Sequence, residues 1–198
     1  MKARILPATL ENVKDAAEAI KNGGLIVYPT ETVYGLGCDP FNVSAVKRLI
    51  KAKGAREKPL PILAHTVHDV KRVAELTEKG EELARKFWPG PLTLILPRKD
   101  LPDIVTLGSA TVGVRIPKDS VALKLLELSG GLLVGTSANK TGAASCSTAL
   151  EAFEQLKDEV DVVLDGGVVE FGVSSTVLDL TSKDPKIIRK GPLTIKET

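Results

Sequence analysis

Several features are scarce or missing in this chain of 198 residues. The two cysteines, Cys38 and Cys146, have no C-x-x-C spacing, and the two histidines, His65 and His68, are not arranged with them. Because a structural zinc ion needs about four such ligands, we interpret both cysteines as packing residues and expect no metal-ligating residues.

No apolar run approaches the roughly 20 residues that cross a bilayer. The amino terminus shows no signal-peptide pattern, so we expect a cytoplasmic protein with no membrane partner.

Nucleotide-binding motifs with a fixed signature are also missing. Neither G-x-x-x-x-G-K-[ST] nor a G-x-G-x-x-G that opens a helix after a strand occurs. Any ATP must then be held by dispersed hydroxyls, loop amides and basic side chains. No Ser-His-Asp or Cys-His nucleophile system is evident, which favours chemistry by positioning and charge neutralisation. The net charge of +2 and the aromatic content of 4% do not point to a nucleic-acid partner.

Strands and helices alternate along the chain, an order typical of an α/β protein. The length suits a single domain, and a terminal strand pair suggests that the sheet is mixed. Hydrophobic periodicity and capping residues predict helices over 10–21, from Asn42 or Ser44 to about 52, and over 67–76, 78–88, 120–128 and 148–156. The predicted strands are 25–28, 60–64, 92–96, 112–116, 132–135, 160–164, 175–180 and 186–189, with loops over 99–109 and 136–148.

The stretch from Gly23 to Gly37, GGLIVYPTETVYGLG, holds a dense set of candidate binding residues. A short apolar strand is closed by Pro29, and a polar set, Thr30-Glu31-Thr32, follows. Strand ends that lead into hydroxyl- and glycine-rich loops are where α/β proteins bind small ligands. The pattern alone fits an ordinary exit from a strand equally well.

The same stretch resembles the opening motif of the Sua5/YrdC/YciO family, the L-threonylcarbamoyladenylate synthases. Five more blocks resemble family motifs in the family's order: FWPGPLTLIL at 87–96, VGVRIP at 112–117, TSAN at 136–139, SSTVLDL at 174–180 and IIRKG at 187–191. The resemblance covers about 10–193, so we expect one YrdC-like domain over 1–198. It implies a large twisted mixed sheet with surrounding helices that enclose a deep cavity.

The resemblance also implies an activity. A family member is a nucleotidyltransferase that condenses L-threonine, bicarbonate or CO2 and ATP, with Mg²⁺, to L-threonylcarbamoyladenylate and pyrophosphate. The product feeds N6-threonylcarbamoylation of adenosine in tRNA by a partner transferase machinery. Relatives have also been regarded as binders of double-stranded RNA or tRNA, and this binding module is the alternative function. A third reading is the related domain of hydrogenase-maturation carbamoyltransferases, which belongs to a much longer chain.

The family motifs assign roles to residues of this sequence. The residues implied for L-threonine are Thr32, Arg115, Gly135 and Ser175. The residues implied for ATP are Lys53, Arg56, Lys58, Thr111, Ser137, Asn139, Ser145 and Arg189, and Lys53 and Arg56 are the implied catalytic pair. From the residues alone, the basic stretch also fits a solvated helix end. Arg115, inside an apolar strand, fits either a structural salt bridge or a fork for a substrate carboxylate.

Three positions depart from the family pattern. Lys53-Gly-Ala-Arg56 has one residue more than the family's Lys-x-Arg element. Ser174 stands where the family usually has glutamate. Leu63 occupies the ungapped place of a family histidine, and His65 lies two residues later.

Overall fold

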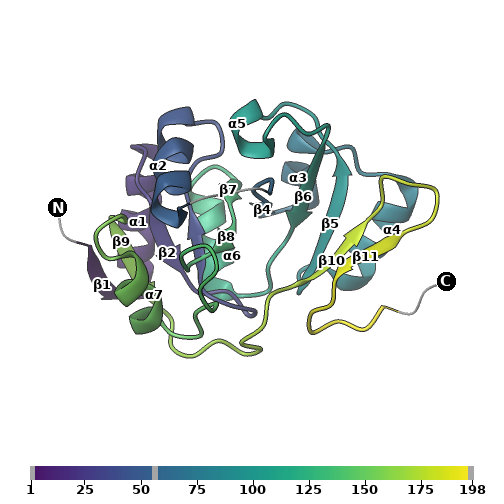
Figure 1. Cartoon of the computed structure of the whole chain (residues 1–198). Coiled ribbons are helices and arrows are strands. Elements are labelled where there is room, and N and C mark those ends of the chain that lie inside the picture. The colour runs from purple at the N-terminus through teal and green to yellow at the C-terminus, as the bar shows by residue number, and fades with distance from the viewer. Residues whose placement is uncertain (1–2, 55–57, 196–198) are drawn as a thin grey trace.

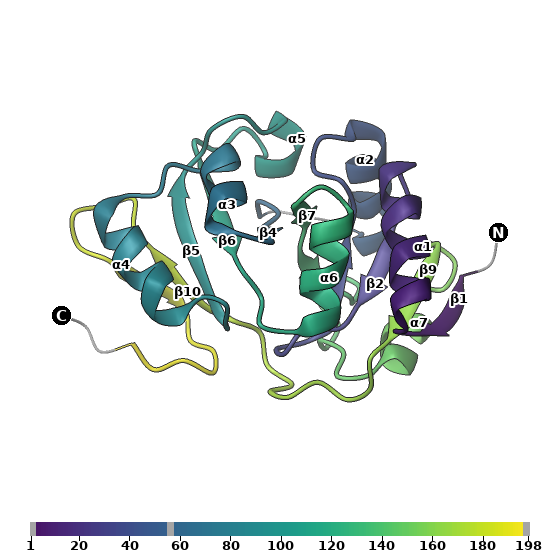
Figure 2. The ribbon, with the colours of Figure 1, turned by 180° about the vertical axis from the view of Figure 1, so that it is seen from behind.

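The computed structural model describes residues 3–54 and 58–195, in which the strands form two mixed sheets with helices around them (Figures 1 and 2). The α/β class and the mixed pairing are confirmed. The strands divide between two sheets, however, instead of forming the one large sheet expected. The sheets meet where the amide of Val134 donates to the carbonyl of Cys38 at 2.9 Å.

The first sheet lies on the left of Figure 1 and has the strand order β1-β9-β2-β3-β8. In that order the strands are Arg4–Pro7, Val162–Asp165, Ile26–Tyr28, Gly35–Gly37 and Thr136–Ser137. Strand β9 runs parallel to β1 and β2, whereas β3 runs antiparallel to β2 and β8. The chain therefore reverses between β2 and β3, which places the polar segment 29–34 at the end of this sheet.

The second sheet extends from the middle to the right of Figure 1 and has the order β11-β10-β5-β6-β4-β7. In that order the strands are Lys186–Arg189, Thr176–Asp179, Leu92–Pro97, Thr111–Arg115, Ile62–Ala64 and Leu132–Val134. The terminal pair β10–β11 is antiparallel, as expected from the sequence.

Seven helices occur in the described residues. They are α1 (Leu10–Lys21), α2 (Val43–Lys53), α3 (Val67–Val73), α4 (Glu78–Phe87), α5 (Asp103–Thr106), α6 (Ser120–Leu128) and α7 (Ala149–Leu156). Side chains cap the predicted starts: Thr9 accepts from the amide of Asn12, and Thr148 from that of Glu151. A short side-chain acceptor at this position satisfies an otherwise unpaired helix amide. None of these helices is long and apolar enough to span a bilayer.

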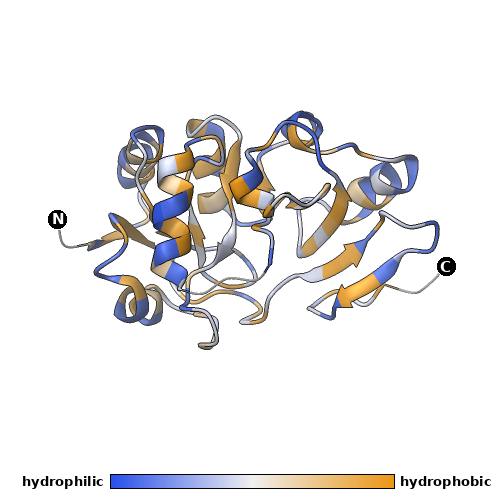
Figure 3. Ribbon diagram, turned by 45° about the horizontal axis from the view of Figure 1, so that its top comes forward, coloured by the Kyte–Doolittle hydropathy of each residue, from blue (hydrophilic) through white to orange (hydrophobic). Residues whose placement is uncertain are grey.

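The two faces of β5 explain where the site lies. Leu92, Leu94 and Leu96 are fully buried in the main core, which also holds residues of α3 and α4. Because successive strand residues point to opposite faces, Thr93 and Ile95 face the other way, and both line a pocket. Figure 3 shows hydrophobic colour along most of this sheet and mixed colour on the helices. One sheet face thus builds the core and the other builds the site.

Four short elements differ from the sequence expectation, which had no strand at β1, β3 or β8 and a loop in place of α5. Strand β1 is an edge strand with largely exposed side chains, so it has no buried face to generate an apolar pattern. Strand β3 is Gly-Leu-Gly, and glycine is depleted in strands. Tertiary pairing with β2 and β8, rather than local propensity, makes β3 a strand.

Candidate active site

A pocket of about 610 Å³ opens on the face of the second sheet that carries Thr93 and Ile95. This volume lies within the usual range for small-molecule sites. Eight residues implied for substrate by the sequence line it: Thr32, Lys58, Thr111, Arg115, Gly135, Ser137, Ser175 and Arg189. The fold therefore brings together positions that are up to 157 residues apart in the chain (32 to 189).

Arg115, the last residue of β6, is the most buried cation of this pocket, with 6% of its surface exposed. Its Nε donates to the carbonyl of Gly90 at 3.0 Å, and its Nη1 donates to the hydroxyl of Thr32 at 2.9 Å. Its Nη2 lies 2.7 Å from Oε2 of Glu31, which makes a buried ion pair. The contact lacks hydrogen-bond geometry, so among the described residues Nη2 has no hydrogen-bond acceptor. Arg115 is thus both part of a salt bridge and an element of the pocket wall.

Glu31 was not among the candidate residues, although it lies between Thr30 and Thr32 in the polar set. It is 5% exposed, and its charge balances that of Arg115. A buried arginine requires such a partner. The signal that could have found it is therefore the arginine itself, since its burial demands a carboxylate.

Ser175 lines the same pocket and lies just before β10. Its hydroxyl lies 2.8 Å from the hydroxyl of Thr93 and accepts from Nη2 of Arg189 at 3.1 Å. Nε of Arg189 also donates to the carbonyl of Ser175 at 2.9 Å. Thr93 was missed from the sequence because a threonine within LTLIL fits an ordinary strand position. The three side chains form one hydrogen-bonded group across β5, β10 and β11.

Gly135 follows β7 and faces Leu63 across the pocket wall. A methyl group at position 135 would overlap with the side chain of Leu63, so glycine is required as long as leucine is present. The same wall contains Thr111, whose hydroxyl lies 3.0 Å from that of Ser109, and Ser174. This part of the pocket is therefore a mixed surface of hydroxyls and one apolar side chain.

Lys53, at the end of α2, lies behind the loop that follows β8. Its Nζ donates to the carbonyl of Ser137 at 2.7 Å and to that of Asn139 at 2.8 Å. It is not part of the pocket wall in the described residues, whereas Ser137 is. Lys53 therefore fixes the backbone that carries Ser137.

Three other candidates lie away from the wall or outside the described structure. Asn139 is buried, and its side-chain amide donates to the carbonyls of Lys140 and Ala143. Ser145 is exposed in the same loop and is not part of the wall. Arg56 lies outside the described residues. The role of Arg56 stays a prediction.

The charge of the pocket is positive. Lys58, Arg115 and Arg189 line it, and no Asp or Glu does so among the described residues. Partial burial, followed by the positive charge of Arg115, lowers the pKa of Arg189 below its ordinary value. Two guanidinium groups that lie close enough for the charge of Arg115 to lower the pKa of Arg189 favour an anion beside them.

The donors on the pocket wall decide whether it can hold a metal ion. Magnesium prefers carboxylate and other oxygen ligands, yet the wall supplies hydroxyls and cations. Across residues 3–54 and 58–195, no group of three or more His, Cys, Asp or Glu side chains could hold a metal ion. The residues of this wall do not fit a magnesium ion held by protein carboxylates.

Both cysteines are buried and unpaired. Burial raises the pKa of Cys38 to about 12 and that of Cys146 to about 11. Both thiols therefore hold their protons at neutral pH.

Comparison with known proteins gives consistent matches over most of the chain. Residues 18–191 match the Sua5/YciO/YrdC family model, which is described as telomere recombination. A threonylcarbamoyl-AMP synthase of Pyrococcus abyssi is 42% identical over 93% of this chain and 55% of its own length. One of Vibrio vulnificus is 33% identical over 92% of this chain and 100% of its own length. The chain thus spans about half the length of the relatives from P. abyssi and Bacillus subtilis.

Solved structures share the fold. P. abyssi Sua5 complexed with L-threonine superposes with a TM-score of 0.93 at 39% identity, over 96% of this chain and 58% of that chain. Escherichia coli YciO superposes with a TM-score of 0.90 at 24% identity, over 98% of both chains. At that identity the likeness to YciO concerns the fold alone.

Proposed function

Because the chain belongs to the Sua5/YciO/YrdC family, we propose that it is an L-threonylcarbamoyladenylate synthase. The reaction condenses L-threonine, bicarbonate or CO2 and MgATP to L-threonylcarbamoyladenylate and pyrophosphate. The observation that carries the proposal is the buried guanidinium of Arg115, which lines a pocket of small-molecule size. Its Nη2 has no hydrogen-bond acceptor among the described residues. A buried arginine fork of this kind suits a substrate carboxylate.

In this proposal L-threonine binds between Arg115 and Ser175. Its carboxylate accepts a hydrogen bond from Nη2 of Arg115. The hydroxyl of Thr32, which accepts from Nη1 of Arg115 at 2.9 Å, lies beside that carboxylate. Ser175 and Thr93 offer a hydroxyl pair that can exchange hydrogen bonds with the substrate's own hydroxyl. Gly135 keeps the wall open next to Leu63.

ATP occupies the remaining part of the pocket. Lys58 and Arg189 supply positive charge for phosphate oxygens, and Thr111 and Ser137 supply hydroxyls. Lys53 acts as a positioning residue, because its ammonium group holds the backbone on both sides of Ala138. Asn139 and Ser145 belong to the same loop and are proposed to act by shaping it. Arg56 is proposed as a further phosphate ligand.

The chemistry needs no covalent intermediate on the protein. The amine of L-threonine adds to CO2 and loses a proton, which gives an N-carboxylate. An oxygen of this carboxylate attacks the α-phosphorus of ATP. The bond between the α-phosphorus and the bridging oxygen breaks, and pyrophosphate leaves with its electron pair. Lys58, Arg115 and Arg189 offset the charge of two anions brought together, which is the usual protein contribution to such a transfer.

The product would feed N6-threonylcarbamoylation of tRNA by partner proteins. Binding of RNA without this activity is the alternative. It has less support, because Arg115 and Ser175 are buried in a pocket of about 610 Å³ that suits a small molecule and not a duplex.

The direct test is pyrophosphate release by the purified protein with MgATP and bicarbonate, with and without L-threonine. We expect release that depends on L-threonine and that falls in Ser175→Ala. Arg115→Lys is the second variant, because it keeps a cation beside Glu31 and loses only the fork. Pyrophosphate release that is the same with and without L-threonine, together with salt-sensitive binding of RNA, would favour the RNA-binding alternative over the proposal.

A further inference from the structure

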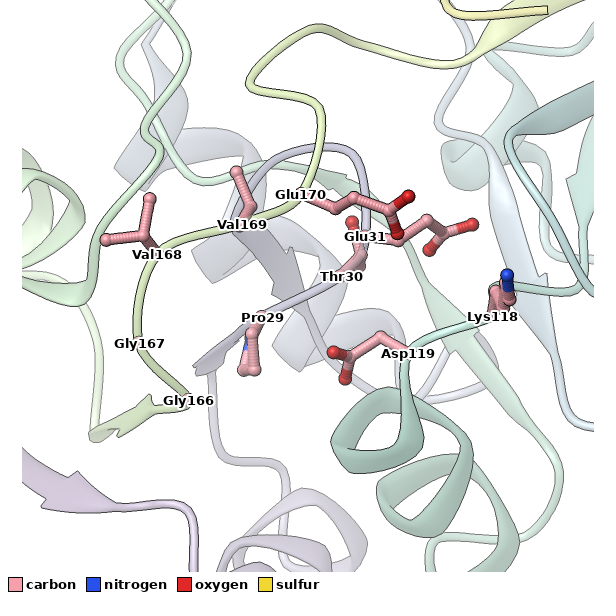
Figure 4. A pocket seen from close by; sticks show the side chains of 10 residues that line it. All are labelled: Pro29, Thr30, Glu31, Lys118, Asp119, Gly166, Gly167, Val168, Val169 and Glu170. Atoms are coloured by element: carbon pink, nitrogen blue, oxygen red, sulfur yellow. The ribbon is translucent and has the colours of Figure 1, made fainter.

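A second pocket, of about 280 Å³, lies beside the substrate pocket (Figure 4). Its walls include Pro29, Thr30 and Glu31, and the next two residues, Thr32 and Val33, line the substrate pocket. The two pockets are therefore adjacent along the chain, and no part of the reaction described above uses the second one.

Carboxylates predominate in the second pocket. Glu31 from the segment after β2, Asp119 before α6 and Glu170 from the loop after β9 all line it. Among the described residues one ammonium group, that of Lys118, lines it as well (Figure 4). Burial is the largest effect that raises the pKa of Asp119. Backbone hydrogen bonds from Val121 and Ala122 oppose it, and the negative charge of Glu31 adds to it. The pocket is thus acidic, next to a substrate pocket that is basic.

Glu31 supplies an independent sign of a missing ligand. Its side chain is 4% exposed, and neither of its carboxylate oxygens has a hydrogen-bond donor within residues 3–54 and 58–195. Oε2 still has the charge of Arg115 at 2.7 Å. A buried acceptor without a donor costs on the order of 1–3 kcal/mol, so a donor brought by a ligand would be stabilised here.

The rest of the wall indicates what kind of cation fits. Pro29, Val168 and Val169 give an apolar side, while the carboxylates lie on the other side (Figure 4). The pocket is several times larger than the roughly 30 Å³ of one water molecule, and the carboxylates do not form a metal-binding group in the described chain. In an alkylguanidinium group, the alkyl chain can pack against the apolar side while the planar guanidinium group donates to the carboxylates.

We propose that this second pocket binds an alkylguanidinium group, such as an arginine side chain, whose fork donates to Glu31, Asp119 and Glu170. The group can come from a partner polypeptide or from a free small molecule, and the test below separates these sources.

The binding is coupled to the substrate pocket through Glu31, and this step rests on the proposed function. A substrate carboxylate on Arg115 would lie near the carboxylate of Glu31, and like charges oppose one another. A guanidinium group in the second pocket offsets that repulsion. Its presence therefore raises the affinity for L-threonine, and L-threonine raises the affinity for the guanidinium by the same factor.

Isothermal titration calorimetry with N-acetyl-arginine amide tests the binding, with the neutral isostere N-acetyl-citrulline amide as its partner. We expect binding of the arginine compound only. Glu170→Gln and Asp119→Asn should each weaken it at least about fivefold, as loss of one charged hydrogen bond implies. The asparagine keeps the α6 cap that Asp119 provides to the amide of Ala122. The matched control is Asp158→Asn, an exposed carboxylate in the turn after α7 that should change nothing.

Equal binding of the citrulline compound, equal loss in Asp158→Asn, or no binding of the arginine compound overturns the proposal. Free L-arginine that binds as tightly as the capped compound supports a small-molecule ligand. Binding of the capped compound alone supports a side chain of a partner chain.

The coupling is read from the Kd of L-threonine with and without the capped arginine. We expect a Kd lower by about fivefold or more, the usual lower range of coupling between sites. An unchanged Kd rejects the coupling and leaves the binding result standing. No L-threonine binding in either condition counts against the proposed function instead, so the two failures are distinguishable.

Discussion

The hydroxyls of Thr93 and Ser175 lie 2.8 Å apart on the wall of the substrate pocket, although the residues are 82 positions apart in the chain. Strands β5 and β10 run parallel and bring them together. Arg189 on β11 holds the other side of Ser175 through its carbonyl and hydroxyl. The orientation of Ser175 is therefore set by two neighbours on two strands.

Thr93→Val removes one of these neighbours while keeping the shape of the side chain. We expect KM for L-threonine to rise about three- to tenfold with little change in kcat, because a hydrogen bond of about 0.5–1.5 kcal/mol is lost. Steady-state pyrophosphate release measures both constants.

Thr93→Ser keeps the hydroxyl and should restore KM. A general loss of structure would lower kcat as well and would not be rescued by serine. An unchanged KM in Thr93→Val would show that Ser175 does not need Thr93.

Lys53→Met tests whether this lysine acts on ATP through the loop. Without its ammonium group, the carbonyls of Ser137 and Asn139 lose a charged donor and the loop is freer to move. We expect KM for ATP to rise about tenfold or more, while the Kd of L-threonine stays near its original value.

The matched control is Lys47→Met, an exposed lysine on the same helix. It should leave both constants unchanged. Equal effects of the two variants would mean that only the charge of α2 matters.

The pair of Glu31 and Arg115 should contribute strongly to stability. Glu31→Gln leaves a buried arginine without a countercharge, and breaking such a pair costs about 3–5 kcal/mol. Urea unfolding followed by circular dichroism measures the change. Glu18→Gln, which breaks an exposed pair with Lys21, should have an effect close to zero. Equal midpoints for the two variants would contradict the account.

Local signals in the sequence were enough to place most elements. Helix α1 begins and ends where the Thr9 cap and the glycines after it predict, and β5 follows the apolar run that starts at Leu92. Elements that depend on tertiary pairing were not predictable. Strand β3 contains two glycines, and β1 lies at a sheet edge, so neither has a pattern of its own.

Site residues that lie in a family motif could be predicted from the sequence. Residues that belong to the site only through their contacts with motif residues could not. Thr32, Arg115 and Ser175 come from motifs and line one pocket. Glu31 and Thr93 emerge only from their distances to Arg115 and Ser175. Asn139 and Ser145 lie in a motif loop, yet they are not on the wall, because a motif records sequence positions and not the direction of a side chain.

The buried thiols predict a loss of stability in alkaline solution. Their pKa values of about 12 for Cys38 and about 11 for Cys146 exceed the ordinary 9.0. Above pH 9 the unfolded chain releases protons that the folded chain keeps, so unfolding becomes more favourable as pH rises, by up to about 1.4 kcal/mol per pH unit for each group. Urea midpoints between pH 8 and pH 10 measure this, with Cys38→Ala as the comparison at each pH. A midpoint that falls equally in that variant would assign the loss to other groups.

The central claim is tested most directly by the identity of the product. The protein is incubated with L-threonine, MgATP and isotopically labelled bicarbonate, and the nucleotides are analysed by mass spectrometry. We predict a threonylcarbamoyl adenylate that carries the bicarbonate label, formed only when all three substrates are present. Threonyl adenylate without the label, or hydrolysis of ATP that ignores both L-threonine and bicarbonate, would contradict the account.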